Sequence, residues 1–375
     1  MMLVEMGSRR IPSLDGLRAI SICLVLFGHL SGTANFFPLS AFAVVVANLG
    51  VRVFFVISGF LITFLMLDEI EATGKVSLKL FYLRRTLRIF PASYAYILFV
   101  FLASRLGWPT LLPGDLFHAV TYTENYHLHT SWVVGHLWSL SVEEQFYLLW
   151  PALIAFFSLR HATLFAFSAL LIAPISRLAI ATFLPAYRWG IGWWFPTIMD
   201  PIATGCLLAI FRNRLEADSF YMSVLRSRWF VLIPCSAFLA NMRPDGRRLS
   251  MLLLQPFINL ALAVTMHRVV IFNKTMLGRF LNMRPVAFIG VLSYSIYLWQ
   301  QPFLNRSSHS AVCAFPWNLM IVRIAAAESY AFMERPALAI RKKLEQRVEQ
   351  RFPLKSRIPS QPPGPARSRT ARAVR

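Results

Sequence analysis

The feature that most constrains this chain is a series of apolar runs long enough to cross a lipid bilayer. A membrane-spanning helix needs about 20 mainly apolar residues. We therefore predict an all-α, polytopic integral membrane protein with about ten transmembrane helices. The predicted spans lie near 14–33, 48–67, 89–106, 137–159, 163–183, 195–212, 229–242, 250–272, 285–305 and 312–332.

The composition excludes the soluble classes. Of the 375 residues, 57% are hydrophobic and 15% charged, whereas a soluble domain has about 45–50% apolar and about 25% charged residues. In such a chain the net charge of +21 points to loops that face an anionic leaflet, not to nucleic acid. The cysteines, Cys23, Cys206, Cys235 and Cys313, have no CxxC spacing, which indicates neither a disulfide framework nor a zinc site.

The basic residues predict the topology. With a cytoplasmic N-terminus, inside segments hold 28 of the 38 Lys and Arg residues and outside loops hold 7, which places both termini in the cytoplasm. The outside loop at 243–248 carries three arginines against this rule. We assign 1–335 to a membrane domain and 336–375 to a basic cytoplasmic tail, largely disordered from about residue 353 because Pro, Ser and Arg dominate there.

The first span carries two polar residues on one face. Arg18 and His29 are eleven residues apart, about three helical turns, so their side chains point the same way. Asp15 precedes Arg18 by three residues and is placed to pair with it. His29 suits a general base because its charge changes near neutral pH; the structural alternative is a histidine hydrogen-bonded to a neighbouring helix. A signal peptide is disfavoured because Arg18 and His29 interrupt the apolar core.

Two more polar clusters lie near predicted membrane boundaries. Arg84, Arg85 and Arg88 share a helix face before Pro91, which suits the first turn of the third span. Such guanidinium groups bind phosphate near a helix N-terminus, or else anchor the loop in the cytoplasm.

The other polar cluster, in 136–147, contains two adjacent glutamates. Their side chains point about 100° apart around the helix, so at most one of them faces a site directly. The residues concerned are Glu143 and Glu144, with Arg52, Arg177 or His29 as candidate partners.

Several chemistries lack their motifs. The sequence contains no GxSxG nucleophile elbow, P-loop or HExxH motif. Segment 290–302 is rich in aromatic and amide side chains, as in an aromatic belt at a membrane surface. The outer loop carries His118, Glu124, His127 and His129, but no regular element fixes them, so we predict no metal site.

These segments together resemble the membrane acyltransferase family three. The resemblance covers about residues 11–335 and rests on SLDGLR followed by His29, FFVISGFLIT, RRTLRIFP and WSLSVEEQFYLLWP, in that order. YSIYLWQQP and MERP also look like the family's last two spans. The family has ten or more membrane helices, and some members add a periplasmic hydrolase-like domain, for which this chain has no room.

The resemblance implies transfer of an acyl group, here acetyl, from cytoplasmic acyl-CoA to a hydroxyl of an extracytoplasmic or membrane-linked carbohydrate. Such a protein lies in the bacterial inner membrane, uses acyl-CoA as donor substrate and needs no tightly bound cofactor. One position departs from the family, which often has His where this chain has Gln300. The implied site residues are His29, Arg18 and Glu143 for catalysis, Arg84, Arg85 and Arg88 for the CoA phosphates, and Trp138, Ser141, Tyr297 and Gln300 on the acceptor side.

A second class of function stays open at this stage. In a transporter or exporter of a glycan or small molecule, charges inside the spans line a pathway. Arg177 and Arg323 fit that interpretation as well as they fit an enzyme. The two classes differ in whether the thioester of acyl-CoA is broken.

Overall fold

The computed structural model describes residues 11–242, 248, 250–308 and 310–351, and the side chains within them up to residue 345. Every regular element in these ranges is helical. The α-helices are α1 Leu14–Leu30, α2 Ala41–Thr73, α3 Leu78–Arg105, α4 Asp115–Thr121, α5 Trp132–Gly135, α6 Leu137–Phe156, α7 Leu159–Phe183, α8 Phe195–Ile198, α9 Asp200–Ala217, α10 Ser219–Arg226, α11 Leu232–Asn241, α12 Gln255–Ile271, α13 Met276–Leu281, α14 Arg284–Phe303, α15 Trp317–Ser329 and α16 Arg335–Arg351. Short 3₁₀- or π-helical segments are Glu124–Tyr126, Pro185–Gly190, Arg228–Val231, Ser250–Leu254, Ala311–Cys313 and Tyr330–Glu334.

The all-helical prediction is confirmed, and each predicted span coincides with helix. Four helices in the described ranges are long and apolar enough to cross a membrane, and α10 with the segment Arg228–Asn241, bent by 74°, makes up to five. The total of ten spans and the cytoplasmic termini remain predictions. The arginine-rich loop at 243–248 lies almost wholly outside the described residues, as does the tail after residue 351.

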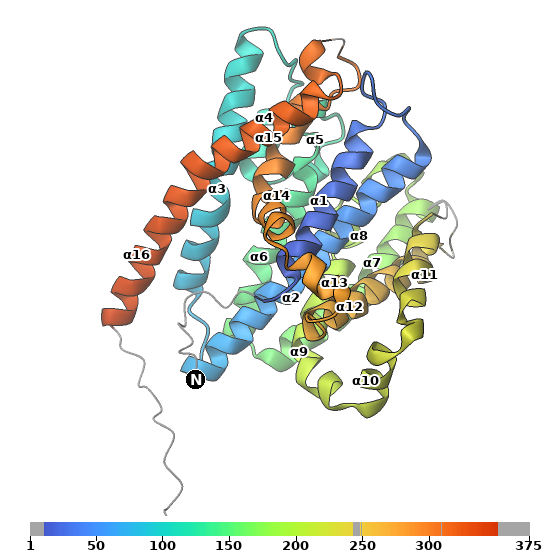
Figure 1. Cartoon of the computed structure of the whole chain (residues 1–375), viewed down its shortest axis with the longest axis vertical. Helices are drawn as coiled ribbons and strands as arrows, with labels where there is room; N and C mark the ends of the chain where they lie inside the picture. The colour runs from blue at the N-terminus through green and yellow to red at the C-terminus, as the bar shows by residue number, and fades with distance from the viewer. Residues whose placement is uncertain (1–10, 243–247, 249, 309, 352–375) are drawn as a thin grey trace, which may run out of the picture.

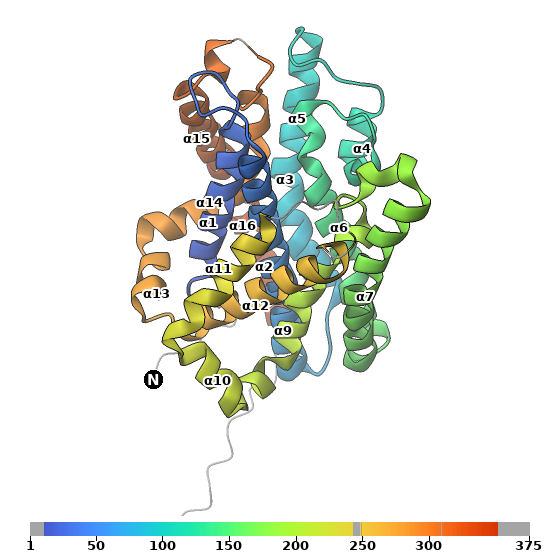
Figure 2. The same cartoon turned by 90° about the vertical axis from the view of Figure 1, so that its right-hand side faces the viewer.

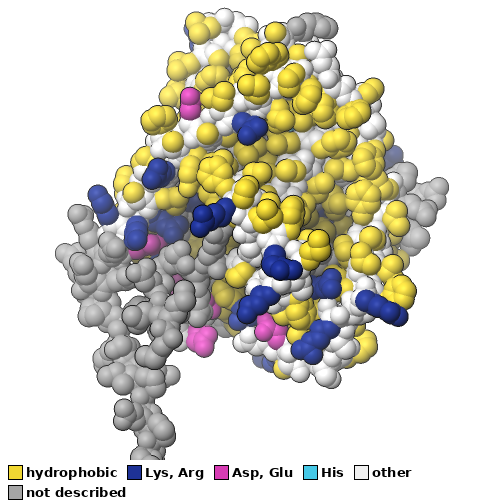
Figure 3. Space-filling model, in the orientation of Figure 1, with side chains coloured by type: hydrophobic (Ala, Val, Ile, Leu, Met, Phe, Trp, Pro, Cys, Tyr) yellow, Lys and Arg dark blue, Asp and Glu magenta, His cyan; other side chains and the backbone are white. Residues whose placement is uncertain are grey.

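The surface matches a protein that sits in lipid. Large apolar side chains such as Leu98, Phe101 and Leu171 are exposed, which is costly in water and favourable in a bilayer. Figure 3 shows hydrophobic side chains over most of one face, with the Lys and Arg side chains concentrated towards its lower part. That end carries α10 and α13 (Figures 1 and 2), whose flanking basic residues the sequence analysis places in the cytoplasm.

Helix α1 is held between α2 and α14, and both contacts are close. A Cβ at Gly290 of α14 would overlap the backbone oxygen of Asp15 in α1, so only glycine allows this approach. In α2, Gly59 lies against the backbone of Ile202 in α9 in the same way. The Gly290 contact sets the position of α1, the helix that carries Arg18 and His29, and the Gly59 contact holds its neighbour α2 against α9 (Figures 1 and 2).

The third helix begins eleven residues before its predicted span. Its first residue is Leu78, after Ser77, whose hydroxyl accepts a hydrogen bond from the Leu80 amide at 3.4 Å. Pro91 therefore lies inside α3, so its predicted place in a first turn is wrong. The apolar run marks only the part of this helix that is hydrophobic, while the amphipathic turns before it, with Arg84 and Arg88, are equally helical.

Candidate functional site

A cavity of about 1740 Å³ runs through the bundle, walled by α1, α2, α3, α6, α14 and α16. One end lies beside Lys75, just after α2, and the other reaches Ser139 of α6 and Tyr297 of α14. Apolar side chains of α2, such as Val51 and Phe55, form much of the wall between these ends. The basic residues that line it are Arg18, Lys75, Lys79, Arg84, Arg85, Arg88, Arg284 and Arg341.

The positive charge of Arg85 is balanced by two carboxylates of the protein. Its guanidinium lies 3.8 Å from Glu143 Oε2 and 3.5 Å from Glu144 Oε1, and 3.5 Å from the centre of the Tyr147 ring. The Ser58 hydroxyl donates a 2.7 Å hydrogen bond to the other Glu143 oxygen. The partner of the two glutamates is thus Arg85, a residue absent from the three candidates of the sequence analysis.

The two glutamates face different surroundings. Glu143 lines the cavity, whereas Glu144 does not, as their 100° separation predicts.

The arginine cluster does not lie at a helix N-terminus, as the sequence analysis expected. Helix α3 begins at Leu78, and Arg85 lies in its third turn. Any anion held by this cluster is therefore bound by side chains and not by free backbone amides.

Arg18 and Arg88 have a different environment from Arg85. Both line the cavity, and neither forms an ion pair with any residue that the structure describes. The expected pairing of Arg18 with Asp15 is therefore wrong: the Arg18 side chain lies in the cavity wall beside Arg88 and close enough to repel it. Glu143 and Glu334 act on these two arginines only from beyond ion-pair distance. Two like charges held together in a cavity in this way are suited to binding an anion.

His29 lies beyond the inner end of this cavity. Its Nδ1 is 3.2 Å from Gln300 Oε1 on α14, and its ring packs edge-on against Trp132 with 5.7 Å between the ring centroids. Tyr297, which lines the cavity, is one helical turn before Gln300. His29 itself is not among the lining residues, so a substrate must extend past Tyr297 to reach it.

The contacts of Gln300 fix which nitrogen of His29 carries the proton. The Gln300 amide donates from Nε2 to the Tyr297 carbonyl at 3.3 Å, which turns its oxygen toward His29. An oxygen only accepts, so Nδ1 of His29 is the donor and Nε2 of the neutral ring keeps its lone pair. No hydrogen bond engages that Nε2 within the described ranges. The structural alternative of the sequence analysis, a histidine hydrogen-bonded to a neighbouring helix, is therefore what the structure shows, and the role of His29 as a base remains a prediction.

The four predicted acceptor-side residues are spread over separate environments. Tyr297 donates to the His136 carbonyl at 2.8 Å and its hydroxyl lies 2.6 Å from that of Ser139. Trp138 stacks on Trp193, with 5.7 Å between ring centroids, beside a small pocket of about 110 Å³. Ser141 is buried and accepts from the Glu124 amide at 3.2 Å, away from both cavities.

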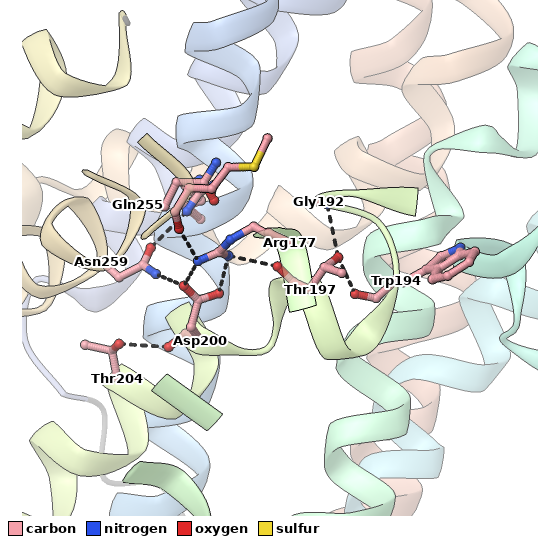
Figure 4. Close-up of polar contacts among 10 residues, drawn as sticks. Arg177, Gly192, Trp194, Thr197, Asp200, Thr204, Gln255 and Asn259 are labelled. Atoms are coloured by element: carbon pink, nitrogen blue, oxygen red, sulfur yellow. Dashed lines mark hydrogen bonds and ion pairs between the residues drawn. The ribbon is translucent and has the colours of Figure 1, made fainter. Parts of the chain in front are cut away.

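Sequence reasoning named Arg177 but missed its partner Asp200 and the buried network that the two residues form behind the small pocket (Figure 4). Arg177 of α7 binds Asp200 of α9 through two bonds of 3.1 and 3.0 Å, and both side chains are fully buried. Asn259 of α12 donates to Asp200 at 2.8 Å. Asp200 was detectable as an acidic residue inside the predicted span 195–212, but nothing in the sequence pairs it with Arg177.

This network also holds the loop that carries Trp193. Arg177 donates to the Thr197 carbonyl at 2.8 Å, and the Thr197 hydroxyl accepts from the Gly192 amide at 3.0 Å (Figure 4). On the other side, Asn259 and Gln255 accept from Arg52 at 3.1 and 2.7 Å. The whole network, of which the ion pair is the centre, therefore connects α2, α7, α9 and α12 and positions one wall of the small pocket.

Glu124, in the loop segment between α4 and α5, gives the protein a pH-dependent stability. Burial raises the pKa of its carboxyl from 4.5 to about 7, partly offset by the hydroxyl of Thr130, which donates to it. Stability is then unaffected below pH 4.5, falls as the pH rises from 4.5 to 7 and stays low above it. The full loss is about 3 kcal/mol. We expect Glu124→Gln to abolish this fall.

The check is thermal unfolding of the detergent-solubilised protein from pH 4.5 to pH 8. Glu328→Gln, at an exposed position, is the control and should unfold like the wild type at every pH. A fall in the melting temperature of Glu124→Gln as steep as that of the wild type would show that Glu124 is not the titrating group.

Comparison with known proteins supports an enzyme. Residues 11–310 match the model of the acyltransferase domain family. The chain is 28% identical to the peptidoglycan O-acetyltransferase OatA of Listeria monocytogenes over 87% of its own length and 55% of that protein. It is also 28% identical to the O-acetyltransferase OatA of Staphylococcus aureus, over 89% of its length and 58% of that protein.

The chain thus spans little more than half the length of these relatives. No solved structure matches it. The family match, which extends from α1 into the segment after α14, includes Arg18, His29, the α3 arginines, Glu143 and Gln300. On this evidence the chain belongs to the acyltransferase domain family.

Proposed function

We propose that the protein is a membrane O-acyltransferase that moves an acetyl group from cytoplasmic acetyl-CoA to a hydroxyl of an extracytoplasmic or membrane-linked carbohydrate. The observation that carries this proposal is the cavity with Arg18 and Arg88 in its wall, neither of which forms an ion pair with a residue that the structure describes. CoA is a phosphate-rich anion on a long, flexible pantetheine arm. A basic surface at one end of an apolar channel fits such a molecule.

The donor's orientation follows from the lining. The phosphates lie among the basic residues, and the pantetheine arm runs past Val51 and Phe55 toward Ser139 and Tyr297. Because Tyr297 is one turn from Gln300, the thioester at the end of the arm comes close to His29. Arg85 contributes to the shape of the cavity wall through its contacts with Glu143, while Arg88 and Arg18 hold the phosphates.

The chemistry needs one base and no protein nucleophile. A sugar hydroxyl attacks the thioester carbonyl while Nε2 of His29 takes its proton, and the bond between the carbonyl carbon and sulfur then breaks. His29 returns the proton to the departing CoA sulfur, so the products are an O-acetyl ester and free CoA. Gln300 keeps Nδ1 protonated throughout. In this role an amide fulfils the orienting function that a further histidine would otherwise serve.

The acceptor is proposed from the relatives and from the aromatic side chains. The Listeria relative is named as an O-acetyltransferase of peptidoglycan, a polymer with carbohydrate strands. In this chain Trp138 and Trp193 offer stacked indole rings at the predicted outer side, a surface type that suits the apolar faces of sugars. We therefore propose a surface polysaccharide, lipo-oligosaccharide or glycolipid as acceptor, reached from outside the inner membrane.

The positions of the two arginines that suggested a transporter argue against that alternative. Arg177 is fully buried in a bidentate pair with Asp200, so it lines neither cavity. Arg323 of α15 is exposed and lies outside both cavities as well. Arg177 therefore belongs to a structural ion pair and Arg323 lies at the surface, so neither lines a pathway through the bundle.

Arg88→Ala is expected to raise the KM for acetyl-CoA by about tenfold or more, with a smaller effect on kcat, because it removes charged hydrogen bonds to phosphate. The assay is transfer of labelled acetyl groups from acetyl-CoA to native glycan by membrane vesicles. Arg105→Ala, at the exposed far end of the same helix, is the matched control and should behave like the wild type. An Arg88→Ala enzyme with an unchanged KM and a lowered kcat would contradict donor binding by Arg88.

The same vesicles test the transporter alternative. If a solute crossed the membrane while the thioester of acetyl-CoA stayed intact, the wild-type protein would be a transporter.

A further inference from the structure

Helix α16 places two charged side chains in the wall of the donor cavity. Arg341 and Glu345 both line it, although the helix begins at Arg335, after the end of the family match at residue 310. Figure 1 shows α16 running along the outside of the bundle beside α3, the helix that carries Arg84 and Arg88. These two residues thus extend the site beyond the part of the chain that matches the family.

Glu345 is shared between two arginines. Its Oε1 lies 2.6 Å from Arg84 Nε and 3.3 Å from Arg341 Nε, and only 10% of its side chain is exposed. Arg84 has a weaker second contact with Glu69, at 4.0 Å. A carboxylate oxygen held by two guanidinium groups occupies the same kind of position that a phosphate oxygen takes between two arginines.

Among the basic residues that line the cavity, two groups of arginines differ in their ion pairs. The inner group, Arg18 and Arg88, has no ion pair in the part of the chain that the structure describes. The outer group, Arg84 and Arg341, is bridged by Glu345. CoA likewise carries two phosphate groups: the diphosphate that leads into the pantetheine arm, and a single phosphate on the ribose 3′ oxygen at the far end.

We propose that Arg84 and Arg341 bind the ribose 3′-phosphate of the donor, and that Glu345 occupies this phosphate position until the donor displaces it. This inference rests on the proposed function, since it assigns a subsite for the CoA donor. The order along the cavity supports the assignment, because the pantetheine arm must point inward and the diphosphate then meets Arg18 and Arg88. A phosphate monoester carries more charge and more acceptor oxygens than a carboxylate, so it competes successfully for both arginines.

The proposal makes opposite predictions for the two residues of α16. Arg341→Ala removes one guanidinium from the 3′-phosphate and should weaken CoA binding by about tenfold. Glu345→Gln removes the competing charge and should tighten CoA binding several-fold. Neither change should affect 3′-dephospho-CoA, which lacks the phosphate that this subsite binds.

The experiment is calorimetric titration of the full-length protein in nanodiscs with CoA and with 3′-dephospho-CoA. Lys343→Ala removes a positive charge from an exposed position on the same helix, outside the cavity, and serves as the matched control for general electrostatics. We expect only Arg341→Ala and Glu345→Gln to change the ratio of the two dissociation constants.

Two results would overturn the assignment. Equal weakening of both ligands by Arg341→Ala, or no weakening of either, would remove Arg341 from a 3′-phosphate subsite. Weaker CoA binding by Glu345→Gln would show that Glu345 supports the site and does not compete for it. If the wild type bound neither ligand, the acyl-CoA donor itself would be wrong, whereas binding that depends on Arg88 alone would leave the proposed function intact and reject only the subsite.

Discussion

Replacement of His29 with alanine is expected to lower the rate of acetyl transfer by about 10²–10⁴-fold, the usual contribution of a general base. The physical reason is the hydrogen bond from Nδ1 to Gln300, which leaves Nε2 as the basic atom. Because His29 lies beyond the cavity's lining residues, its loss should leave CoA binding unchanged. The effect should therefore appear in kcat, at equal membrane levels of the protein.

A second variant separates the base from its orienting partner. Gln300→Leu retains His29 and removes only the acceptor for Nδ1–H, so the ring can take either tautomer and we expect a loss of about tenfold. Both variants are measured as acetyl transfer to native glycan, with CoA binding determined in parallel. A His29→Ala enzyme with more than a tenth of wild-type transfer would disqualify His29 as the base, and the reacting group would have to be sought among the lining residues, beginning with Glu143.

The sequence predicts the helices well because a bilayer imposes a simple rule on composition. Apolar runs of membrane length locate α2, α3, α7 and the helix that ends at Ile271. The same rule misplaces the start of α3, since the turns from Leu78 to Arg88 are amphipathic and line the cavity. It also says nothing of α16, whose mainly polar sequence was assigned to a basic cytoplasmic tail with no helix predicted in it.

The site is predictable only as far as residues on one helix are concerned. Helical spacing brings Arg84, Arg85 and Arg88 together and separates Glu143 from Glu144. It does not reveal that Arg85 pairs with both glutamates of α6, or that Gln300 of α14 orients His29 of α1. These contacts join residues far apart in the sequence, and their formation depends on how glycines such as Gly290 allow the helices to approach. A motif lists the charged groups of a site, but tertiary packing decides which of them are neutralised.

The Arg177–Asp200 pair should carry the largest stability effect in the molecule. Arg177→Met leaves Asp200 as a fully buried charge whose carboxylate keeps only Asn259 as a donor among the described residues. Breaking a buried pair in this way costs about 3–5 kcal/mol. We expect a large drop in the amount of folded protein in the membrane and in its thermal stability in detergent. Arg188→Ala, which removes an exposed arginine near the same helix, should have little effect.

The double variant Arg177→Met/Asp200→Leu distinguishes a structural pair from a functional one. Replacing both charges with apolar groups removes the unpaired carboxylate, so stability should recover most of what the single variant loses. If acetyl transfer recovers with it, the pair acts only by holding α7, α9 and α12 together and by positioning the loop with Trp193. Full stability without transfer would contradict this purely structural role, because the two charges would then be needed for the reaction itself.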